Sequence, residues 1–412
     1  MSLNHTPSGD RMHIGFFGRT NAGKSSLVNA VAGQELAVVS DTKGTTTDPV
    51  YKAMELLPLG PVLVIDTPGI DDTGSLGELR VRKTKQVLNK TDLAILVIDS
   101  VEGITEIEEK MIVLFEEKQV PYLLVYNKMD LAEDESNIKK YNGEGKQQSI
   151  CFGEMAVSAF TKEGIHALKE KLAHFARTEE KDSKIVGDLL RPMDIVVLVV
   201  PIDSAAPKGR LILPQQQVIR DILETGAVSI VTKDSELEEA LDKLELKPDM
   251  VITDSQVFKE VAAVVPENVY LTSFSILMAR KKGFLDAAVK GVLALDSIQD
   301  KDKILIAEGC THHRQCEDIG TVKLPKWIRE YTGKEPEFRF CSGTEFPEDL
   351  SEYRLVLHCG GCMLNEREVR YRMKCAQDQK VSFTNYGITI AHMNGILKRS
   401  VEMLPELCKA FG

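Results

Sequence analysis

The chain has 412 residues, 43% of them hydrophobic, and a formal net charge of −11 at pH 7. This length predicts more than one domain, and the acidic balance argues against a general nucleic-acid binder. No apolar run is long enough to span a membrane, and the polar segment 1–13 lacks the hydrophobic core of a signal peptide. We therefore expect a cytoplasmic protein without membrane or nucleic-acid partners, in which the eight cysteines are ligands or buried thiols rather than disulfides.

Residues 12–176 alternate short apolar runs with amphipathic stretches, a pattern typical of buried parallel strands joined by helices. The apolar runs lie at 13–17, 62–66, 93–99 and 122–126. We expect a doubly wound α/β domain over residues 1–178, followed by a charged linker at 177–184.

A second α/β pattern follows this linker. Its apolar runs, which predict strands, lie at 194–201, 227–231, 250–253 and 269–272. The segment carries no cluster of candidate catalytic or metal-binding residues. We therefore expect a scaffold or dimerisation domain over residues 185–268.

A third α/β unit is predicted over residues 273–412. Its expected strands lie at 303–307, 354–358 and 381–384, and they run into the loops 308–310, 359–362 and 385–387. Sites in open α/β sheets gather beyond the carboxyl ends of the strands, so we expect these loops to meet. The whole chain is thus predicted to be an α/β protein of three domains, with mainly parallel sheets in the two smaller ones.

The segment GRTNAGKS, residues 18–25, has the spacing of a phosphate-binding loop and lies between a predicted strand and a predicted helix. Glycines let backbone N–H groups approach phosphate oxygens, Lys24 supplies charge to the β- and γ-phosphates, and Ser25 can ligate Mg²⁺. The residues of this loop expected to contact the nucleotide or its ions are Gly18, Asn21, Ala22, Gly23, Lys24, Ser25 and Ser26.

Two further boxes complete a GTP site. The segment DTPG, residues 66–69, follows a strong strand; Asp66 can hold Mg²⁺ through water and the Gly69 amide can meet the γ-phosphate. The segment NKMD, residues 127–130, closes a later strand, and the Asp130 carboxylate can accept two hydrogen bonds that guanine offers and adenine does not. The predicted base-binding residues are Asn127, Lys128, Asp130, Ser158 and Ala159. This sequential set resembles the translation-factor-related GTPases, so we expect GTP and GDP as the nucleotides.

The segment around the first switch refines the expected hydrolysis mechanism. Residues 44–48, GTTTD, resemble the first switch of the Era and tRNA-modification GTPase group, so Thr45 or Thr46 should reach Mg²⁺ when GTP is bound. Ile70 stands where Ras-like enzymes carry a water-orienting glutamine, and a hydrocarbon cannot orient water. The residues expected to act in hydrolysis are Lys24, Thr45, Thr46, Asp66 and Gly69.

The missing glutamine has a consequence for the ions of the site. In relatives with this substitution, K⁺ beside the phosphates can supply positive charge, and its ligand is an asparagine of the phosphate loop, which Asn21 matches. We therefore expect slow intrinsic hydrolysis that K⁺ stimulates.

Cysteine and histidine residues gather near the C-terminus, as Cys310-Thr-His312 and His358-Cys359-Gly-Gly-Cys362. A redox dithiol would not need the distant Cys310. A structural zinc site usually pairs two knuckles, and one spacer residue between Cys310 and His312 makes a poor one, although zinc remains an alternative. A [4Fe–4S] cluster held by Cys310, Cys359 and Cys362 fits better, because three thiolates leave one iron with an exchangeable position.

The fourth ligand of such a cluster stays open among Glu308, His312 and His358. A carboxylate binds iron more weakly than a thiolate and would leave readily, whereas either histidine can instead donate a hydrogen bond to a ligand. The remaining cysteines lack partners at ligand spacing and are expected to be buried thiols, except for Cys316, which lies close enough to be a spare ligand; the expected buried thiols are Cys151, Cys341, Cys375 and Cys408.

Taken together, these motifs closely resemble one family, HydF, the [FeFe]-hydrogenase maturation GTPases. The resemblance covers the whole chain and rests on the GTPase boxes, the order of the domains and the CxH…HCxxC pattern of residues 310–362. It implies a [4Fe–4S] scaffold in the domain 273–412 that carries a di-iron subcluster precursor and passes it to apo-[FeFe]-hydrogenase. It also implies two radical-SAM maturases as partners, a homodimer formed through the middle domain, and GTP as a switch of partner exchange.

Two other functional classes remain open from the residues alone. One is a GTPase acting on ribosomes or RNA, with zinc as a structural staple. The other is a redox-sensing GTPase whose cluster only reports oxidation. The net negative charge argues against a GTPase that acts on RNA. Transfer of a di-iron complex to apo-hydrogenase would exclude a protein that only senses oxidation.

Overall fold

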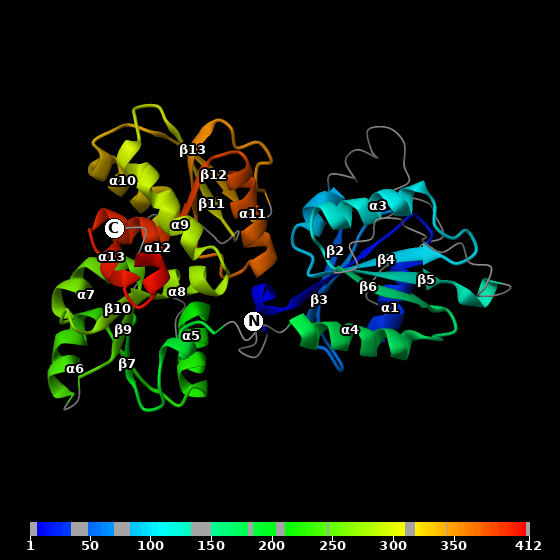
Figure 1. Ribbon diagram of the computed structural model, residues 1–412, viewed down its shortest axis with the longest axis horizontal. Helices are drawn as coiled ribbons and strands as arrows, with labels where there is room; N and C mark the ends of the chain where they lie inside the picture. Colours follow the sequence, from blue (N-terminus) through cyan, green and yellow to red (C-terminus); the bar gives the residue numbers. More distant parts are fainter. Residues whose placement is uncertain are drawn as a thin grey trace. The chain divides into compact units, whose positions relative to one another are not determined.

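The computed structural model describes residues 6–33, 48–69, 83–132, 150–179, 184–202, 211–244, 247–309, 318–343 and 345–408. It divides into two compact units, Met1–Lys181 and Asp182–Gly412, which are described in turn (Figure 1). Among the helices of the described residues, none combines the length and the apolar character needed to cross a bilayer.

The first unit is built on a six-stranded sheet with the order β2-β3-β1-β4-β5-β6. Its strands are β1 Met12–Phe17, β2 Val50–Leu56, β3 Gly60–Asp66, β4 Leu93–Asp99, β5 Tyr122–Asn127 and β6 Cys151–Ala156. Strand β2 pairs antiparallel with β3 at one edge, and the other neighbours are parallel. The four apolar runs of the sequence coincide with β1, β3, β4 and β5, and β4 is buried along its whole length.

Helices cover both faces of this sheet. Helices α1 (Lys24–Ala32) and α4 (Ile165–Glu179) pack on one face, where Leu27 and Leu168 share a core. Helix α3 (Glu106–Glu117) packs on the other face through Ile112. This two-sided cover explains the continuously apolar central strands, because each is buried on both sides.

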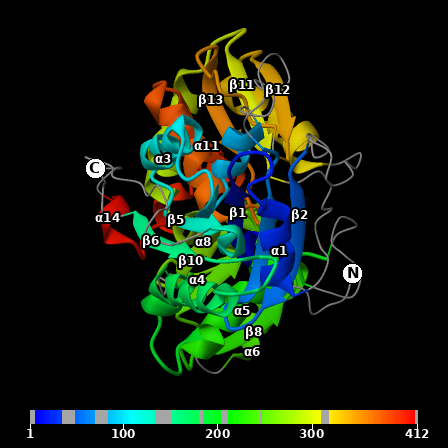
Figure 2. The ribbon, with the colours of Figure 1, turned by 90° about the vertical axis from the view of Figure 1, so that its right-hand side faces the viewer.

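The second unit holds two four-stranded parallel sheets, with the orders β10-β9-β7-β8 and β12-β11-β13-β14. Strands β13, β11 and β12 lie side by side in the second sheet (Figure 2). The strands are β7 Ile195–Val199, β8 Val228–Thr232, β9 Met250–Thr253, β10 Tyr270–Ser273, β11 Lys303–Glu308, β12 Glu337–Ser342, β13 Tyr353–His358 and β14 Ser382–Asn385. The α-helices are α5 Leu213–Glu224, α6 Leu237–Lys243, α7 Phe258–Val264, α8 Phe274–Lys281, α9 Leu285–Val292, α10 Leu324–Thr332, α11 Glu366–Asp378, α12 Tyr386–Met393, α13 Leu397–Ser400 and α14 Pro405–Cys408.

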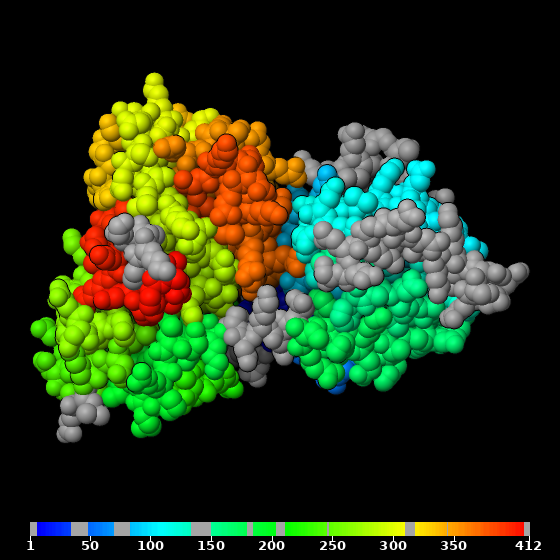
Figure 3. All heavy atoms as spheres, viewed as in Figure 1, coloured from blue at the N-terminus to red at the C-terminus, as the bar shows by residue number. Residues whose placement is uncertain are grey.

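One hydrophobic core joins the two sheets of this unit. It contains Val197 and Val251 of the first sheet together with Ile304 and Leu355 of the second. Helix α9 lies directly on β14, since a Cβ placed on Gly291 would come within 2.1 Å of a β14 carbonyl oxygen. The C-terminal segment, drawn in red, lies against the green and yellow segments of the unit (Figure 3). The second and third α/β patterns of the sequence therefore fold as one packed body.

Polar side chains at the ends of strands β10 and β14, and in the loop after β13, begin helices in this unit. Ser273 caps α8, Asn365 caps α11 and Asn385 caps α12, in each case by accepting a backbone N–H of the first turn. The expected site loop 385–387 is thus the start of a helix, and the Asn385 oxygen is used by the Ile388 N–H at 2.9 Å.

Candidate functional site

The phosphate-binding loop connects β1 to α1 and is tightly folded. Gly18 has a φ of +140°, and a Cβ there would lie 2.3 Å from the Val97 carbonyl oxygen, so only glycine fits. The Lys24 ammonium donates to the carbonyl oxygens of Gly18 at 3.1 Å and Arg19 at 2.6 Å. Its side chain is only 7% exposed, which places a desolvated cation inside the loop.

Ser25 and Asp66, the two residues predicted to hold Mg²⁺, are in direct contact. The Ser25 hydroxyl donates to Asp66 Oδ2 at 2.6 Å, and Asp66 Oδ1 is buried with no hydrogen-bond partner among the described residues. Burial raises the pKa of the Asp66 carboxyl, while the Ser25 hydrogen bond and the Lys24 charge act in the opposite direction. An orphaned carboxylate oxygen beside a serine hydroxyl fits an ion held partly through water. The DTPG box also touches the phosphate loop, because a Cβ on Gly69 would lie 2.2 Å from Thr20 Oγ1.

The base-binding segments meet through Asn127. Its side-chain Nδ2 donates to the Ala22 carbonyl at 3.1 Å, and its Oδ1 accepts the Ala159 N–H at 3.0 Å. The Ser158 hydroxyl donates to Asp130 Oδ1 at 2.6 Å. The phosphate loop, the NKMD box and the Ser158-Ala159 pair are therefore one connected structure.

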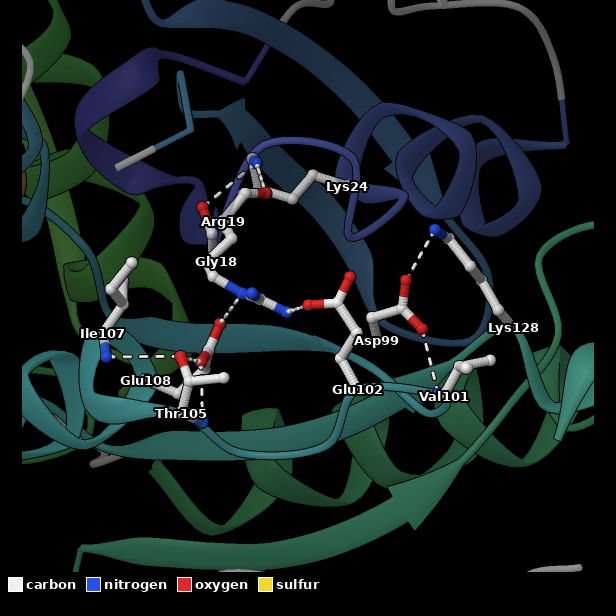
Figure 4. A network of polar contacts seen from close by, with 10 residues as sticks. All are labelled: Gly18, Arg19, Lys24, Asp99, Val101, Glu102, Thr105, Ile107, Glu108 and Lys128. Atoms are coloured by element: carbon white, nitrogen blue, oxygen red, sulfur yellow. Dashed lines mark hydrogen bonds and ion pairs between the residues drawn. The ribbon is translucent and has the colours of Figure 1, made fainter. Parts of the chain in front are cut away.

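A polar network that the sequence motifs do not contain braces the phosphate loop (Figure 4). The Arg19 guanidinium contacts Glu108 Oε1 at 2.9 Å and Glu102 Oε2 at 2.7 Å. Glu108 is fully buried and its second oxygen accepts the Thr105 N–H at 3.0 Å, completing the capping box of α3. The T-x-x-E pattern at 105–108 predicts the cap, but no pattern in the sequence links it to Arg19.

The base-binding loop has a separate anchor. The Lys128 ammonium contacts Asp99 Oδ2 at 2.7 Å, and Asp99 Oδ1 accepts the Val101 N–H at 3.0 Å. Asn21 has a φ of +64°, a conformation that asparagine tolerates better than most residues. The predicted switch residues Thr45 and Thr46, together with Ile70, lie outside the described residues.

The second candidate site lies at the carboxyl ends of β11 and β13. Glu308 ends β11, His358 ends β13, and Cys359 and Cys362 follow in the next loop. The Cys359 sulfur accepts the backbone N–H groups of Gly309 at 3.0 Å and Gly361 at 3.3 Å. These are the N–H···S bonds that iron–sulfur sites use to stabilise thiolate sulfur. Burial raises the pKa of the Cys359 thiol, and the two N–H groups oppose this.

The described residues contain only part of the predicted ligand set. Cys310 and His312 lie outside them, and among the residues that are described no three metal-ligating side chains converge. Gly309, which precedes Cys310 in the sequence, nevertheless touches the cysteine loop, because its added Cβ would lie 3.6 Å from Gly361 Cα. The end of β11 and the cysteine loop are therefore in contact at Gly309.

His358 is enclosed behind the cysteine loop. It is fully buried, its Nδ1 contacts the Cys359 carbonyl oxygen at 2.7 Å, and its Nε2 lies 3.3 Å from Arg372 Nη1. A carbonyl only accepts, so Nδ1 carries the proton and Nε2 accepts from Arg372. Burial, with the charges of Arg372 and Lys282, lowers the pKa of His358 to about 3, so the ring is neutral.

Two cations are buried beside this loop. Arg372 is fully buried and pairs with Glu368 at 2.9 Å. Lys282 is 6% exposed, and its ammonium donates to the carbonyl oxygens of Gly361 and Leu364. Neither residue belongs to a sequence motif of the site.

Glu308 is the other predicted ligand candidate. It is 6% exposed, and Tyr386 donates its hydroxyl to Glu308 Oε1 at 3.4 Å. A Cβ on Gly320 would lie 2.6 Å from the same oxygen, so the carboxylate packs closely against this glycine.

The isolated cysteines differ from the expectation of buried thiols. Cys151, Cys341 and Cys375 form no disulfide among the described residues and are only half-buried. Burial still raises the pKa of Cys341 to about 11. The side chain of Cys408 and all of Cys316 lie outside the described residues.

With this geometry in place, the chain can be compared with known proteins. Residues 185–283 match the family model of the hydrogen maturase F dimerization domain, and residues 286–403 match that of the hydrogen maturase F tetramerization domain. The two matches together cover more than half of the chain. The chain belongs to the HydF family. Its two C-terminal domains are thus oligomerisation domains, and the second was not predicted from the sequence to have that role.

The first unit is a P-loop GTPase domain, since residues 13–128 match the model of the 50S ribosome-binding GTPases. The tRNA modification GTPase MnmE of Chromobacterium violaceum is 36% identical over 186 residues, 45% of this chain and 39% of that protein. GTPase Der of Nautilia profundicola is 34% identical over 174 residues, 41% of this chain and 37% of that protein. The chain therefore spans less than two fifths of the length of these curated relatives.

The structural comparison gives one further observation. A crystal structure of Aquifex aeolicus Era bound to GDP and AlF4⁻ superimposes with a TM-score of 0.36 and 18% identity, over 54% of this chain and 92% of that one.

Proposed function

We propose that this HydF-family protein is a cytoplasmic GTP hydrolase and iron–sulfur scaffold, which carries a di-iron precursor and transfers it to apo-[FeFe]-hydrogenase. The observation that supports this most directly is the cysteine loop of residues 359–362 in a chain whose C-terminal domains match hydrogen maturase F. The radical-SAM maturases would supply the precursor, and GTP would control which partner is bound.

In the GTPase half of this proposal, the chain's own groups bind and orient the nucleotide. Lys24 would turn from the loop carbonyls to the phosphates, Ser25 and Asp66 would hold Mg²⁺, and Asp130 would select guanine. Mg²⁺ would neutralise the phosphate charge that grows during hydrolysis.

We further propose that K⁺ stimulates hydrolysis through Asn21. Rates in KCl and NaCl at equal ionic strength test this, with Asn21→Ala as the variant. We expect faster hydrolysis in KCl for the wild type and no cation preference for the variant. Equal wild-type rates in the two salts would remove the K⁺ assignment.

In the scaffold half, Cys310, Cys359 and Cys362 would hold the cluster. Both ring nitrogens of His358 are engaged, which favours an orienting role for this residue over ligation. Glu308 ends the strand that leads to Cys310, and an exchangeable carboxylate suits a position that must accept cargo. His312 stays an alternative. When bound, the cluster would supply an iron with one replaceable ligand.

The decisive experiment is anaerobic purification and reconstitution, followed by iron, sulfide and zinc analysis. About four irons and four sulfides per chain are expected for one cubane. A stoichiometric zinc content without sulfide would support the structural-zinc alternative. Transfer is tested separately, by activation of apo-[FeFe]-hydrogenase with protein preloaded by the maturases; a cluster without such transfer would favour the redox-sensing alternative.

A further inference from the structure

The backbone of Cys359 is held by hydrogen bonds on both sides. Its N–H donates to the Ala307 carbonyl at 2.9 Å, which continues the ladder between β11 and β13, and its carbonyl oxygen accepts from His358 Nδ1 at 2.7 Å. Two further backbone N–H groups reach its sulfur, so both the backbone and the side chain of this cysteine are fixed. The His358 ring is one of the groups that fix them.

The His358 ring packs against the cysteine loop and against the neighbouring strand. A Cβ on Gly361 would lie 3.5 Å from His358 Cε1, and the centroid of the imidazole lies 5.7 Å from that of the Phe383 ring on β14. His358 is fully buried, so these contacts leave the ring little room to turn. Its action on Cys359 therefore depends on which ring nitrogen carries the proton.

Arg372 determines the position of this proton. A guanidinium only donates hydrogen bonds, and Arg372 Nη1 lies 3.3 Å from His358 Nε2, so Nε2 presents its lone pair and Nδ1 carries the proton. In the other neutral tautomer, the Nδ1 lone pair would face the Cys359 carbonyl oxygen at 2.7 Å and repel it. Arg372 thus selects the tautomer that binds the cysteine backbone.

The Arg372 guanidinium is itself oriented by its other contacts. Its Nε and Nη2 lie 3.0 and 2.9 Å from Glu368 Oε1, one turn earlier on α11, and Nη2 also donates to the Gly343 carbonyl at 2.5 Å. The ring of Phe346 lies 5.1 Å from Cζ. Arg372 is fully buried and its charge is paired with that of Glu368. What it contributes to the cysteine loop is therefore a hydrogen bond of fixed direction.

We propose that Arg372 is a positioning residue for the cysteine-bound cluster and acts through His358, whose tautomer it selects. This inference rests on the proposed iron–sulfur function. Glu368, Arg372, His358 and Cys359 then form one chain of hydrogen bonds that ends at a cluster ligand. Loss of a group that orients a metal ligand typically weakens metal binding by ~10–100-fold.

The test follows iron release from the anaerobically reconstituted full chain to an excess of a ferrous chelator. The electron paramagnetic resonance spectrum of the dithionite-reduced cluster is recorded beside it. The pair variant, Arg372→Met with Glu368→Gln, removes the guanidinium without leaving a buried carboxylate unpaired. Lys326→Met with Glu330→Gln is the matched control, because these two residues form an ion pair one turn apart on α10 with side chains 73% and 60% exposed. Iron and sulfide are measured first, and a wild type without a cluster would contradict the proposed function itself.

Two substitutions of His358 separate positioning from general packing. In His358→Asn the amide nitrogen is as many bonds from Cβ as Nδ1 and can donate to the Cys359 carbonyl without Arg372, whereas in His358→Gln it corresponds to Nε2.

We expect the pair variant to release iron ~10–100-fold faster than the wild type and to show shifted g values, while the control matches the wild type. His358→Gln should release iron faster than His358→Asn. In the His358→Asn background the pair variant should add little to the release rate, because no tautomer is left to select.

Three outcomes overturn the inference while leaving the scaffold function intact. One is a pair variant with the wild-type release rate and g values. Another is an effect of the pair variant that is as large in the His358→Asn background as in the wild type, because Arg372 would then act only through the packing of α11. The third is equal iron release from His358→Asn and His358→Gln, and this comparison decides the matter even if the pair variant does not fold.

Discussion

The nucleotide site and the cysteine site each contain a lysine held inside a loop by carbonyl oxygens, yet only one is visible in the sequence. Lys24 lies within the loop that it serves, five residues from the Arg19 carbonyl. Lys282 lies 79 residues from the Gly361 carbonyl, on a helix of the preceding domain. The comparison teaches that a lysine which anchors a loop can belong to the loop's own segment or can reach it from a distant part of the fold.

The largest expected effect is that of Lys24→Ala. Loss of the main phosphate cation should cost ~2–5 kcal/mol of nucleotide binding free energy, which removes measurable binding at micromolar GTP. Isothermal titration calorimetry with GTP and GDP measures this. Iron content should be unchanged, because the cysteines lie in the other compact unit; loss of iron in this variant would show that the two sites are not independent.

The reciprocal change is Cys359→Ala. Its sulfur accepts two backbone N–H groups, and a cubane left with two thiolates has two open irons, so most of the iron should be lost. GTP turnover should persist. Iron and sulfide analysis beside a phosphate-release assay measures both. Cys375→Ala is the control, because Cys375 is a half-buried cysteine that is not among the predicted ligands; equal iron loss from the control would contradict the ligand assignment.

Guanine selection is tested by Asp130→Asn. Each hydrogen bond to a charged group contributes ~1.5–3 kcal/mol, so GTP affinity should fall about tenfold to a hundredfold. Xanthosine triphosphate should bind better than GTP, because the amide donates where that base has a carbonyl. Competition binding with the two nucleotides gives the answer, and unchanged GTP affinity would mean that Asp130 does not contact the base.

The smallest effect is expected at the brace of the phosphate loop. Arg19→Met leaves the buried Glu108 carboxylate without its guanidinium and should weaken GTP binding severalfold, with a loss of ~1–3 kcal/mol in the stability of the GTPase unit. Adding Glu108→Gln should recover part of both losses, since the uncompensated charge is then gone. Glu102→Gln is the control, because Glu102 is 59% exposed and such pairs contribute little. If the losses of stability caused by Arg19→Met and Glu108→Gln simply add in the double variant, Arg19 and Glu108 are not energetically coupled.

The fold was largely predictable because the central strands of the sheets are continuously apolar. The runs at 93–99 and 122–126 became β4 and β5, and the parallel α/β class is confirmed. The edge strands β2, β6 and β12 were not predicted, because they are partly exposed and lack an apolar run. Asn385 was placed in a site loop but caps α12, since asparagine serves a helix start as readily as a ligand site.

The long-range parts of both sites could not be predicted for a different reason. Contacts such as Arg19 with Glu108 and Lys282 with Gly361 join segments that are brought together only by the packing of complete elements. Neither contact has a local pattern in the sequence. The partners of Arg19 and Lys282 can therefore be assigned only from the folded structure.

The core shared by the two C-terminal sheets has a consequence for how this part of the chain denatures. Val197 and Leu355 belong to one buried cluster, so neither sheet can lose its packing without exposing the apolar face of the other. Residues 182–412 should consequently melt in a single cooperative transition, and a protease that opens one sheet should degrade both. A fragment of residues 286–403 alone would expose the apolar side chains of this shared core to water and should aggregate. A fragment of residues 182–412 keeps the core complete and should remain monodisperse.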